Sequence, residues 1–358
     1  MKNALSIGIA GAGLLGRLLA WQLARAGHRV SVFDPARDAL PSFDGRQAAG
    51  FTAAGMLSPV AELDTSSAEV AALGWRSLVL WRGIVSRLQS APHFRAEGSL
   101  LLAHRNDVGS AQRVLARLAS AVPGTPQAEP VSQARLAELE PALHGASHAW
   151  LLPGEGQIDP VATLLALHAE AADVQWHWNR SVASVAPGAL VLQDGTQRRF
   201  DMVFDARGTG SRPELPVRGV RGETVWLHAP GHGLTRPVRL LHPRHRVYLV
   251  PRPGDIVLVG ASEIESEDRS PVSLRSAVEL MAAAHSIVPA LAEARIQRLD
   301  VNLRPALPDN EPHIEAGPGR VRINGLFRHG WLIAPALVED ALKQCGLATP
   351  AIEEVAHE

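Results

Sequence analysis

Short apolar runs alternate with stretches of helical periodicity along most of the chain, and glycines or polar turns separate them. Residues 5–10 form the first run, whose small and branched apolar side chains are typical of a buried strand. Leucines at helical spacing follow up to Gly27, and residues 29–33 form a second apolar run. The pattern therefore predicts a β-α-β unit near the start of the chain.

The remaining periodicity predicts further helices and many short strands. The predicted helices cover about residues 66–89, 111–119, 133–139, 159–172, 274–286 and 333–345. The predicted strands cover about residues 97–102, 149–152, 174–178, 182–185, 190–193, 202–205, 225–228, 247–250, 256–260 and 320–323, and residues 123–130 are predicted to form a surface loop. Alternating strands are densest between residues 221 and 304, which indicates a second sheet.

This order of elements predicts an α/β fold with two domains, as the length of 358 residues also suggests. The first domain is expected to be a discontinuous, doubly wound, Rossmann-like nucleotide-binding domain made of residues 1–80, 150–218 and 305–358. The second is expected to be a sheet-rich α+β substrate domain made of residues 81–149 and 219–304. A cleft between the two domains is the expected active site.

Composition and charge favour a cytoplasmic protein with a small-molecule partner. The 35 Lys and Arg residues nearly balance the 36 Asp and Glu residues, so no overall field would attract nucleic acid or anionic lipid. Cys345 is the single cysteine and can form no internal disulfide. Arg17 and several glycines interrupt the apolar segment at residues 4–23, so we expect neither a signal peptide nor a membrane span there.

The glycine-rich sequence after the first predicted strand is typical of a dinucleotide-binding site. In this G-x-G-x-x-G motif Gly11 would make the tight turn, Gly13 would let a pyrophosphate approach the backbone, and Gly16 would let helix and strand pack closely. Asp34 ends the second strand, where its carboxylate can accept hydrogen bonds from the ribose hydroxyls. An ordinary turn between strand and helix is the structural alternative, and the motif alone leaves NAD and FAD open.

Segments far apart in the chain resemble one known family. They are the glycine motif with Asp34, the run Ala53-Ala-Gly-Met-Leu57, Tyr248-Leu-Val-Pro-Arg252, Leu303-Arg-Pro305 and Arg328-His-Gly-Trp-Leu-Ile-Ala-Pro335. Together they resemble the FAD-dependent amine and amino-acid oxidases, and among them the thiamine-pathway glycine oxidases. The resemblance spans nearly the whole chain and implies FAD as the cofactor. Because no cysteine occurs near these motifs, we expect FAD to be bound without a covalent thioether, and no spacing of ligands predicts a metal.

The resemblance also implies a set of cofactor-binding residues. They are Gly11, Gly13, Gly16, Asp34, Ala54, Gly55, Met56, Val182, Ala206, Gly208, Arg328, Gly330, Leu332 and Ile333. For three catalytic residues it implies that Arg304 binds the substrate carboxylate, that Tyr248 is its hydroxyl partner, and that Arg328 lies near substrate and flavin. Purely structural alternatives are a strand-to-loop junction at Arg304, core packing at Tyr248 and Met56, and a surface ion pair at Arg328.

The expected chemistry agrees with this assignment. Flavin accepts a hydride from an amine α-carbon, so the protein has to orient the substrate and stabilise charge. The planar fork of an arginine can hold a carboxylate by two charge-assisted hydrogen bonds. The N-terminus of the helix beginning at Gly330 would face the flavin and stabilise its negative charge on reduction.

Several positions depart from the family pattern. Leu326, Phe327 and His329 replace residues common around Arg328, and Glu263 stands where an apolar side chain often lines the pocket. An acid at this last position is compatible with a more basic substrate or with a side chain in solvent. The pair of histidines in His242-Pro-Arg-His245 is interpreted as a solvated loop and not as a metal site, and neither His313 nor His329 has an evident acidic partner.

The resemblance implies oxidative deamination of a small amino acid, glycine first, by hydride transfer from Cα to flavin N5. O2 would reoxidise the flavin, and the products would be hydrogen peroxide, a 2-oxo acid and ammonia. Alternatives are a secondary-amine oxidase that accepts sarcosine, a quinone-linked D-amino acid dehydrogenase, and a protein that binds FAD without turnover. Homo-oligomers are compatible with the sequence.

Overall fold

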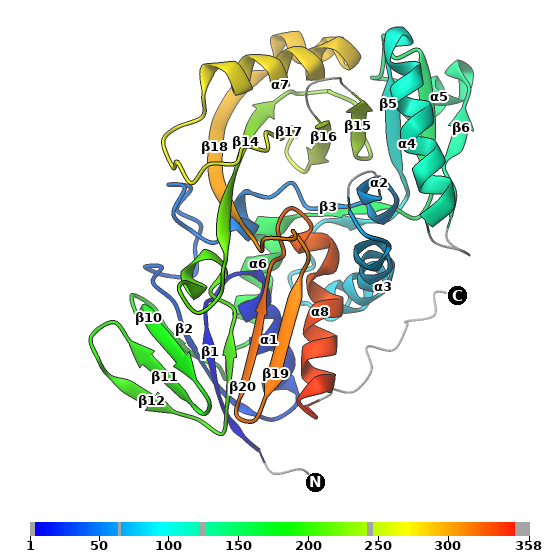
Figure 1. Cartoon of the computed structure of the whole chain (residues 1–358). Coiled ribbons are helices and arrows are strands. Elements are labelled where there is room, and N and C mark those ends of the chain that lie inside the picture. Colours follow the sequence, from blue (N-terminus) through cyan, green and yellow to red (C-terminus); the bar gives the residue numbers. More distant parts are fainter. Residues whose placement is uncertain (1–3, 64–65, 122–125, 242–245, 348–358) are drawn as a thin grey trace.

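The computed structural model describes residues 4–63, 66–121, 126–241 and 246–347. Two large sheets, each with helices on it, account for most of the described chain (Figure 1). A large cavity lies between the elements that carry the predicted site residues. The mixed α/β architecture confirms the predicted fold class.

The first large sheet has six strands and contains the N-terminal β-α-β unit. Its strand order is β19 (His313–Gly317), β20 (Arg320–Asn324), β13 (Met202–Asp205), β1 (Ser6–Ala10), β2 (Arg29–Phe33) and β9 (Gln175–His177). All neighbours are parallel except β19 and β20, which form an antiparallel hairpin at one edge. Ile7 and Ile9 of β1 are fully buried, as expected for a central parallel strand covered on both faces.

Apolar helices pack on this sheet and against one another. They are α1 (Leu14–Arg25), α3 (Ala68–Val85), α6 (Pro160–Ala169) and α8 (Gly330–Gln344), and Figure 1 shows α1 and α8 side by side. Helix α8 contains Pro335, which cannot donate to the carbonyl of Trp331. The indole Nε1 of Trp81 donates to that carbonyl at 2.7 Å, so the proline leaves no buried acceptor unsatisfied.

The second large sheet has eight strands. Their order is β18 (Arg295–Ala306), β14 (Arg218–His228), β17 (Ile256–Gly260), β16 (Arg246–Arg252), β15 (Val238–Leu241), β5 (Ser99–Ala103), β7 (His148–Leu152) and β6 (Glu129–Val131). Helix α7 (Leu274–Ile287) lies across one face of the sheet (Figure 1). Val225 and Leu227 of β14 point to this face, and Gly222 and Thr224, which alternate with them, line the cavity.

Smaller elements complete the described structure. Two three-stranded sheets comprise β10 (Val182–Ala186), β11 (Ala189–Leu192) and β12 (Gln197–Arg199), and β3 (Met56–Leu57), β8 (Gly156–Ile158) and β4 (Phe94–Arg95). The remaining helices are α2 (Pro59–Glu62), α4 (Val108–Ala121), α5 (Gln133–Leu139), and the 3-10 turns η1 (Ala49–Thr52), η2 (Arg105–Asp107), η3 (Gly208–Ser211) and η4 (Pro289–Glu293). Within the described part of the chain, no helix is long and apolar enough to cross a membrane.

The structure contains strands that the sequence pattern did not predict. β18 is the longest strand, yet its first half is largely exposed and charged, so it lacks the apolar alternation of a half-buried strand. Strands β15 and β19 were also missed, and β6 lies partly in the predicted loop at residues 123–130. Periodicity places the start of the last helix at residue 333, whereas the family resemblance places it at Gly330. Helix α8 begins at Gly330, and the glycine and proline near its first turns mask the periodicity there.

The chain segments of the two large sheets support the predicted domain boundaries, which we retain as a proposal. Strands of the six-stranded sheet lie within residues 6–33, 175–205 and 313–324. Strands of the eight-stranded sheet lie within residues 99–152 and 218–306. Each sheet thus draws on separate stretches of sequence, as a discontinuous domain requires.

Candidate active site

A cavity of about 1470 Å³ brings most of the predicted site residues together. The predicted residues that line it are Gly11, Gly13, Asp34, Ala54, Gly55, Met56, Val182, Ala206, Gly208, Tyr248, Arg304, Arg328, Gly330 and Leu332. Gly16 and Ile333 do not line it. Ile333 is fully buried in the core beneath α8, and Gly16 lies where α1 packs against β1.

The glycine motif forms a tight junction between β1 and α1. Gly11 has a φ of +100°, and a Cβ at this position would lie 2.6 Å from the carbonyl oxygen of Ala206. A Cβ on Gly16 would lie 1.8 Å from the carbonyl oxygen of Gly11, so only glycine allows this close packing. No side chain caps the N-terminus of α1, and Gly13 and Leu14 line the cavity there. The backbone N–H groups of this helix end can therefore receive phosphate oxygens.

Asp34 lies beside the helix end, at the edge where β1 and β2 terminate. Its two carboxylate oxygens accept hydrogen bonds from the backbone N–H groups of Ala12, at 2.6 Å, and Ala36, at 2.8 Å. Burial raises the pKa of Asp34, and these two N–H groups and the charge of Arg17 only partly oppose that rise. Asp34 lines the cavity, and a carboxylate that accepts two hydrogen bonds has capacity left to accept from a ribose hydroxyl.

A buried ion pair between Arg207 and Asp205 supports the same end of the cavity. Arg207 binds Asp205 through two nitrogens, with Nε–Oδ1 at 2.9 Å and Nη2–Oδ2 at 2.8 Å. Its Nη1 donates to the carbonyl oxygen of Val182 at 3.2 Å. The pair therefore ties β10, which carries Val182, to the end of β13.

These features fit a bound dinucleotide. The cavity exceeds the roughly 300–1,000 Å³ of ordinary small-molecule sites, so it has room for a large cofactor and a small substrate together. An uncapped helix end, a glycine turn and a carboxylate occur in the order in which phosphates and ribose would require them. Ala54, Gly55 and Met56 also line the cavity, and Ala54 and Met56 belong to one apolar cluster with Tyr248.

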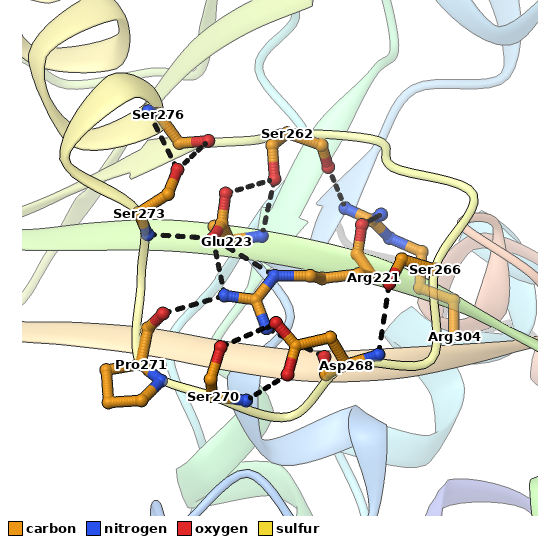
Figure 2. A network of polar contacts seen from close by, with 10 residues as sticks. All are labelled: Arg221, Glu223, Ser262, Ser266, Asp268, Ser270, Pro271, Ser273, Ser276 and Arg304. Carbon is orange, nitrogen blue, oxygen red and sulfur yellow. Dashed lines mark hydrogen bonds and ion pairs between the residues drawn. The ribbon is translucent and has the colours of Figure 1, made fainter.

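Arg304 is a cation of the cavity wall that pairs with no acidic side chain among the described residues. It lies near the end of β18, and its Nη2 donates to the carbonyl oxygen of Ser262 at 3.0 Å (Figure 2). Its Nη1 lies 3.4 Å from the carbonyl oxygen of Arg221. Burial lowers the pKa of Arg304, but an arginine remains charged under all physiological conditions. Its positive charge is therefore available to an anionic ligand.

A buried polar network holds the carbonyl groups to which Arg304 donates (Figure 2). Glu223 of β14 accepts from the Arg221 guanidinium at 2.7 Å and from the Ser262 hydroxyl at 3.0 Å. The Ser262 hydroxyl in turn accepts from the Glu223 backbone N–H at 3.0 Å. Arg221 also donates to the carbonyl oxygen of Asp268 at 2.7 Å. The network thus fixes the loop after β17 behind the Arg304 guanidinium.

Arg328, in contrast, is neutralised by acidic side chains. Its Nη2 lies 2.8 Å from Oε2 of Glu62, and its Nη1 lies 3.3 Å from Oε2 of Glu263. The other oxygen of Glu62 lies 2.7 Å from Nη2 of Arg239, and Nδ1 of His329 lies 3.1 Å from Oε2. Burial favours a higher pKa for Glu62, but the surrounding arginines and histidine outweigh it and hold the pKa well below its ordinary value.

Glu62 and Arg239 are site residues that sequence reasoning missed. No local pattern singles them out, because Glu62 belongs to the short helix α2 and Arg239 to the unpredicted strand β15. The structure also supplies the acidic partner that His329 lacked in sequence, since its Nδ1 faces Glu62. Glu263 is part of the cavity wall and pairs with Arg328, and its side chain is also 44% exposed to solvent.

Tyr248 lies in the same wall, on β16, and its ring passes directly over Gly260 of β17. A Cβ on Gly260 would lie 2.5 Å from the Tyr248 hydroxyl oxygen, so the glycine makes room for the phenol. Burial raises the pKa of Tyr248, and the neighbouring arginines only partly oppose it. The phenol is therefore neutral at physiological pH and can donate a hydrogen bond into the cavity.

Other candidate groups of the sequence lie away from this wall. His242 and His245 are outside the described residues, and within the described ranges no cluster of three or more metal-ligating side chains occurs. His313 is exposed on β19. Cys345 is partly buried at the end of α8, and burial raises the pKa of its thiol.

Known proteins are similar to this chain in both sequence and fold. The family model described as FAD dependent oxidoreductase matches residues 6–340. A Rhizobium etli protein named as a thiamine biosynthesis oxidoreductase (ThiO) is 34% identical over 336 residues, which cover 93% of this chain and 94% of that protein. A glycine oxidase of Geobacillus kaustophilus is 25% identical over 368 residues, covering 94% of this chain and 91% of that protein.

The crystal structure of glycine oxidase from Geobacillus kaustophilus superimposes with a TM-score of 0.81 at 23% identity, covering 99% of this chain and 98% of that one. The fold therefore extends over the whole described chain, including both large sheets. The family match covers the glycine motif as well as the arginines of the cavity wall. On this evidence the chain belongs to the DAO family of FAD-dependent oxidoreductases.

Proposed function

We propose that the protein oxidises the amine of a small amino acid, glycine first, with FAD as hydride acceptor. The observation that carries the proposal is Arg304, a cation of the cavity wall with no ion-pair partner among the described residues. An unpaired cation next to a cofactor site is suited to an anionic substrate group. The similarity to glycine oxidases supports an amino acid as that substrate.

In this proposal Arg304 binds the substrate carboxylate and thereby orients Cα. The guanidinium already donates to two carbonyl oxygens, so its direction is set before the substrate arrives. Two charge-assisted hydrogen bonds to a carboxylate contribute about 1.5–3 kcal/mol each. Tyr248, as a neutral phenol, donates a further hydrogen bond to the same carboxylate.

In the same proposal the N-terminus of α8 stabilises charge that develops on the cofactor, and Arg328 shapes the cavity wall beside it. Because Glu62 holds the guanidinium of Arg328, that side chain keeps one orientation beside the cavity. Gly330 and Leu332, at the start of α8, line the cavity, and no side chain caps this helix end. The helix end therefore offers a partial positive charge where the cofactor becomes negative on reduction.

FAD supplies the redox chemistry by accepting a hydride from Cα when it is bound. The substrate leaves as an imine after also losing a proton, and water converts the imine to a 2-oxo acid and ammonia. With O2 as the final acceptor of the two electrons, the further product is hydrogen peroxide. We also propose the cofactor-binding residues expected from the sequence, with Gly16 acting through packing and Ile333 through the core beneath α8.

The test is anaerobic addition of glycine to the purified yellow holoprotein. Bleaching of the visible flavin bands is expected, together with one 2-oxo acid formed for each flavin reduced. Flavin that stays oxidised with glycine, sarcosine and D-alanine would contradict the proposal and favour a protein that binds FAD without turnover. Oxygen-uptake assays with the same three substrates, repeated with a quinone, distinguish the glycine oxidase from the secondary-amine oxidase and the quinone-linked dehydrogenase.

A further inference from the structure

We infer that Glu263 restricts this site to substrates that carry a single carboxylate, by occupying the outer edge of the Arg328 guanidinium. The inference rests on the proposed function, because it assigns the substrate class of the same site. It starts from five charged side chains of the cavity wall, here called the arginine cluster: Arg239, Arg304, Arg328, Glu62 and Glu263. Ion pairs link Arg239, Glu62, Arg328 and Glu263 into one chain.

Counted by themselves, the five side chains of the arginine cluster carry a formal net charge of one positive charge. Three arginines face two glutamates, and both glutamates are engaged by Arg328 or Arg239. The remaining charge is that of Arg304, which donates only to carbonyl oxygens among the described residues. One substrate carboxylate therefore neutralises the cluster. A second carboxylate would leave the cluster with an excess negative charge beside Glu263.

The two glutamates differ in how firmly they are held. Glu62 is only 10% exposed and has two arginines and a histidine around it. The Glu263 side chain is 44% exposed and forms one ion pair with the described residues, at 3.3 Å from Nη1 of Arg328. Glu263 therefore occupies the position at which a second substrate carboxylate would otherwise meet Arg328. It acts as a built-in substitute for that carboxylate.

The same charge distribution argues against a cationic substrate side chain. The charge of Glu263 is shared with Arg328, and both Arg304 and Arg239 lie in the same cluster. A basic group entering here would approach a cluster whose net charge is already positive. The sequence left two roles open for Glu263, which were recognition of a more basic substrate and a side chain in solvent. The contacts favour neither role, because the carboxylate of Glu263 compensates part of the charge of Arg328.

Two unreactive ethers that share one C–O–C backbone and differ by one carboxylate test the inference. Methoxyacetate carries one carboxylate, and diglycolate carries two on the same ether backbone. Neither has an amine nitrogen, so neither can undergo the proposed reaction. Binding of each to the oxidised holoprotein is measured from the perturbation of the visible flavin spectrum and, independently, by titration calorimetry. The readout is thus independent of turnover.

For the unmodified protein we expect methoxyacetate to bind at least about tenfold more tightly than diglycolate, because close like charges in a partly buried site repel. In the variant Glu263→Gln the affinity for diglycolate should rise at least about tenfold, while that for methoxyacetate changes by no more than about threefold. The matched control is Glu265→Gln. Glu265 lies two residues further along, pairs with Arg218 and does not line the cavity. This control should keep the original ratio of affinities.

An equal affinity of the unmodified protein for both ethers would overturn the inference, and so would an unchanged ratio in Glu263→Gln. Failure of both ethers to bind would overturn it as well, because the cluster would then accept no carboxylate. A failure of the proposed function is distinct from these results. It would appear as flavin that no amino acid reduces, whereas the two ethers can still bind with the expected ratio.

Discussion

The guanidinium of Arg304 occupies space that the absent side chain of Gly222 leaves open. A Cβ added to Gly222 would lie 2.5 Å from Cζ of Arg304 and closer than van der Waals contact to both terminal nitrogens. The two residues are on the adjacent strands β14 and β18, whose pairing fixes their separation. The glycine therefore determines where the carboxylate-binding group can lie.

We predict that Gly222→Ala displaces Arg304 and weakens substrate binding without loss of FAD. A misplacement of about 1 Å can reduce the rate by on the order of 100-fold, so kcat/KM for glycine should fall at least about tenfold. Steady-state kinetics and the visible flavin spectrum measure the two effects. Gly317→Ala is the control, since no atom lies near a Cβ at that exposed position of β19. Unchanged kinetics in Gly222→Ala would mean that the guanidinium can move without consequence.

Removal of the guanidinium itself should act mainly on KM. Arg304→Ala loses two charge-assisted hydrogen bonds, so we expect KM for glycine to rise on the order of 100-fold, while the bound FAD keeps its spectrum. Arg304→Lys should restore part of the affinity, because it keeps the charge without the planar fork. Arg275→Ala, a change at an exposed position of α7, is the control. A KM that stays the same in Arg304→Ala would remove this residue from the site.

Stability at acidic pH should depend on Glu62. Its pKa is held well below the ordinary value in the folded protein, so its contribution is complete above about pH 5 and is lost as pH falls through the folded pKa. The free energy of unfolding should therefore decrease between about pH 5 and pH 3, and less steeply in Glu62→Gln. At pH 7 this variant should be less stable by about 3 kcal/mol, because it leaves buried arginine charge uncompensated.

Denaturant titrations of both proteins across this pH range measure the difference. The control is Glu129→Gln, because Glu129 is exposed on β6 and should leave the pH dependence as it is. The free energy of unfolding of Glu62→Gln could instead fall as steeply with decreasing pH as that of the unmodified protein. The Glu62 carboxylate would then not titrate as its contacts with Arg328 and Arg239 imply.

Affinity for FAD should depend on Asp34. The variant Asp34→Ala removes the acceptor for the ribose and the anchor of the Ala12 and Ala36 N–H groups. Since a hydrogen bond to a charged group contributes about 1.5–3 kcal/mol, the Kd for FAD should rise by about tenfold to a hundredfold. Titration of the apoprotein with FAD, followed by quenching of flavin fluorescence, measures it. Asp173→Ala, at an exposed position outside the cavity, should bind FAD normally, and equal affinities of both variants would exclude the proposed role.

Local sequence patterns were sufficient for the cofactor half of the molecule. The strands β1 and β2 and the helix α1 have continuous apolar signals, and the glycine motif joins them within a few residues. These interactions are short in range, so periodicity and turn chemistry describe them well. Resemblance of the separated motifs to the amino-acid oxidases correctly indicated FAD, and the family match confirms it.

Tertiary structure alone decided which charged side chains of the proposed substrate site form ion pairs. Glu62 lies on α2, Arg239 on β15 and Arg328 just before α8, so their contacts depend on the packing of distant segments. The sequence contains all of these charges but does not say which are paired. By itself it determined the β-α-β unit and the nature of the cofactor. Only the folded chain decided that Arg328 is neutralised and that Arg304 is not, because an ion pair requires two side chains to be brought within a few ångströms of each other.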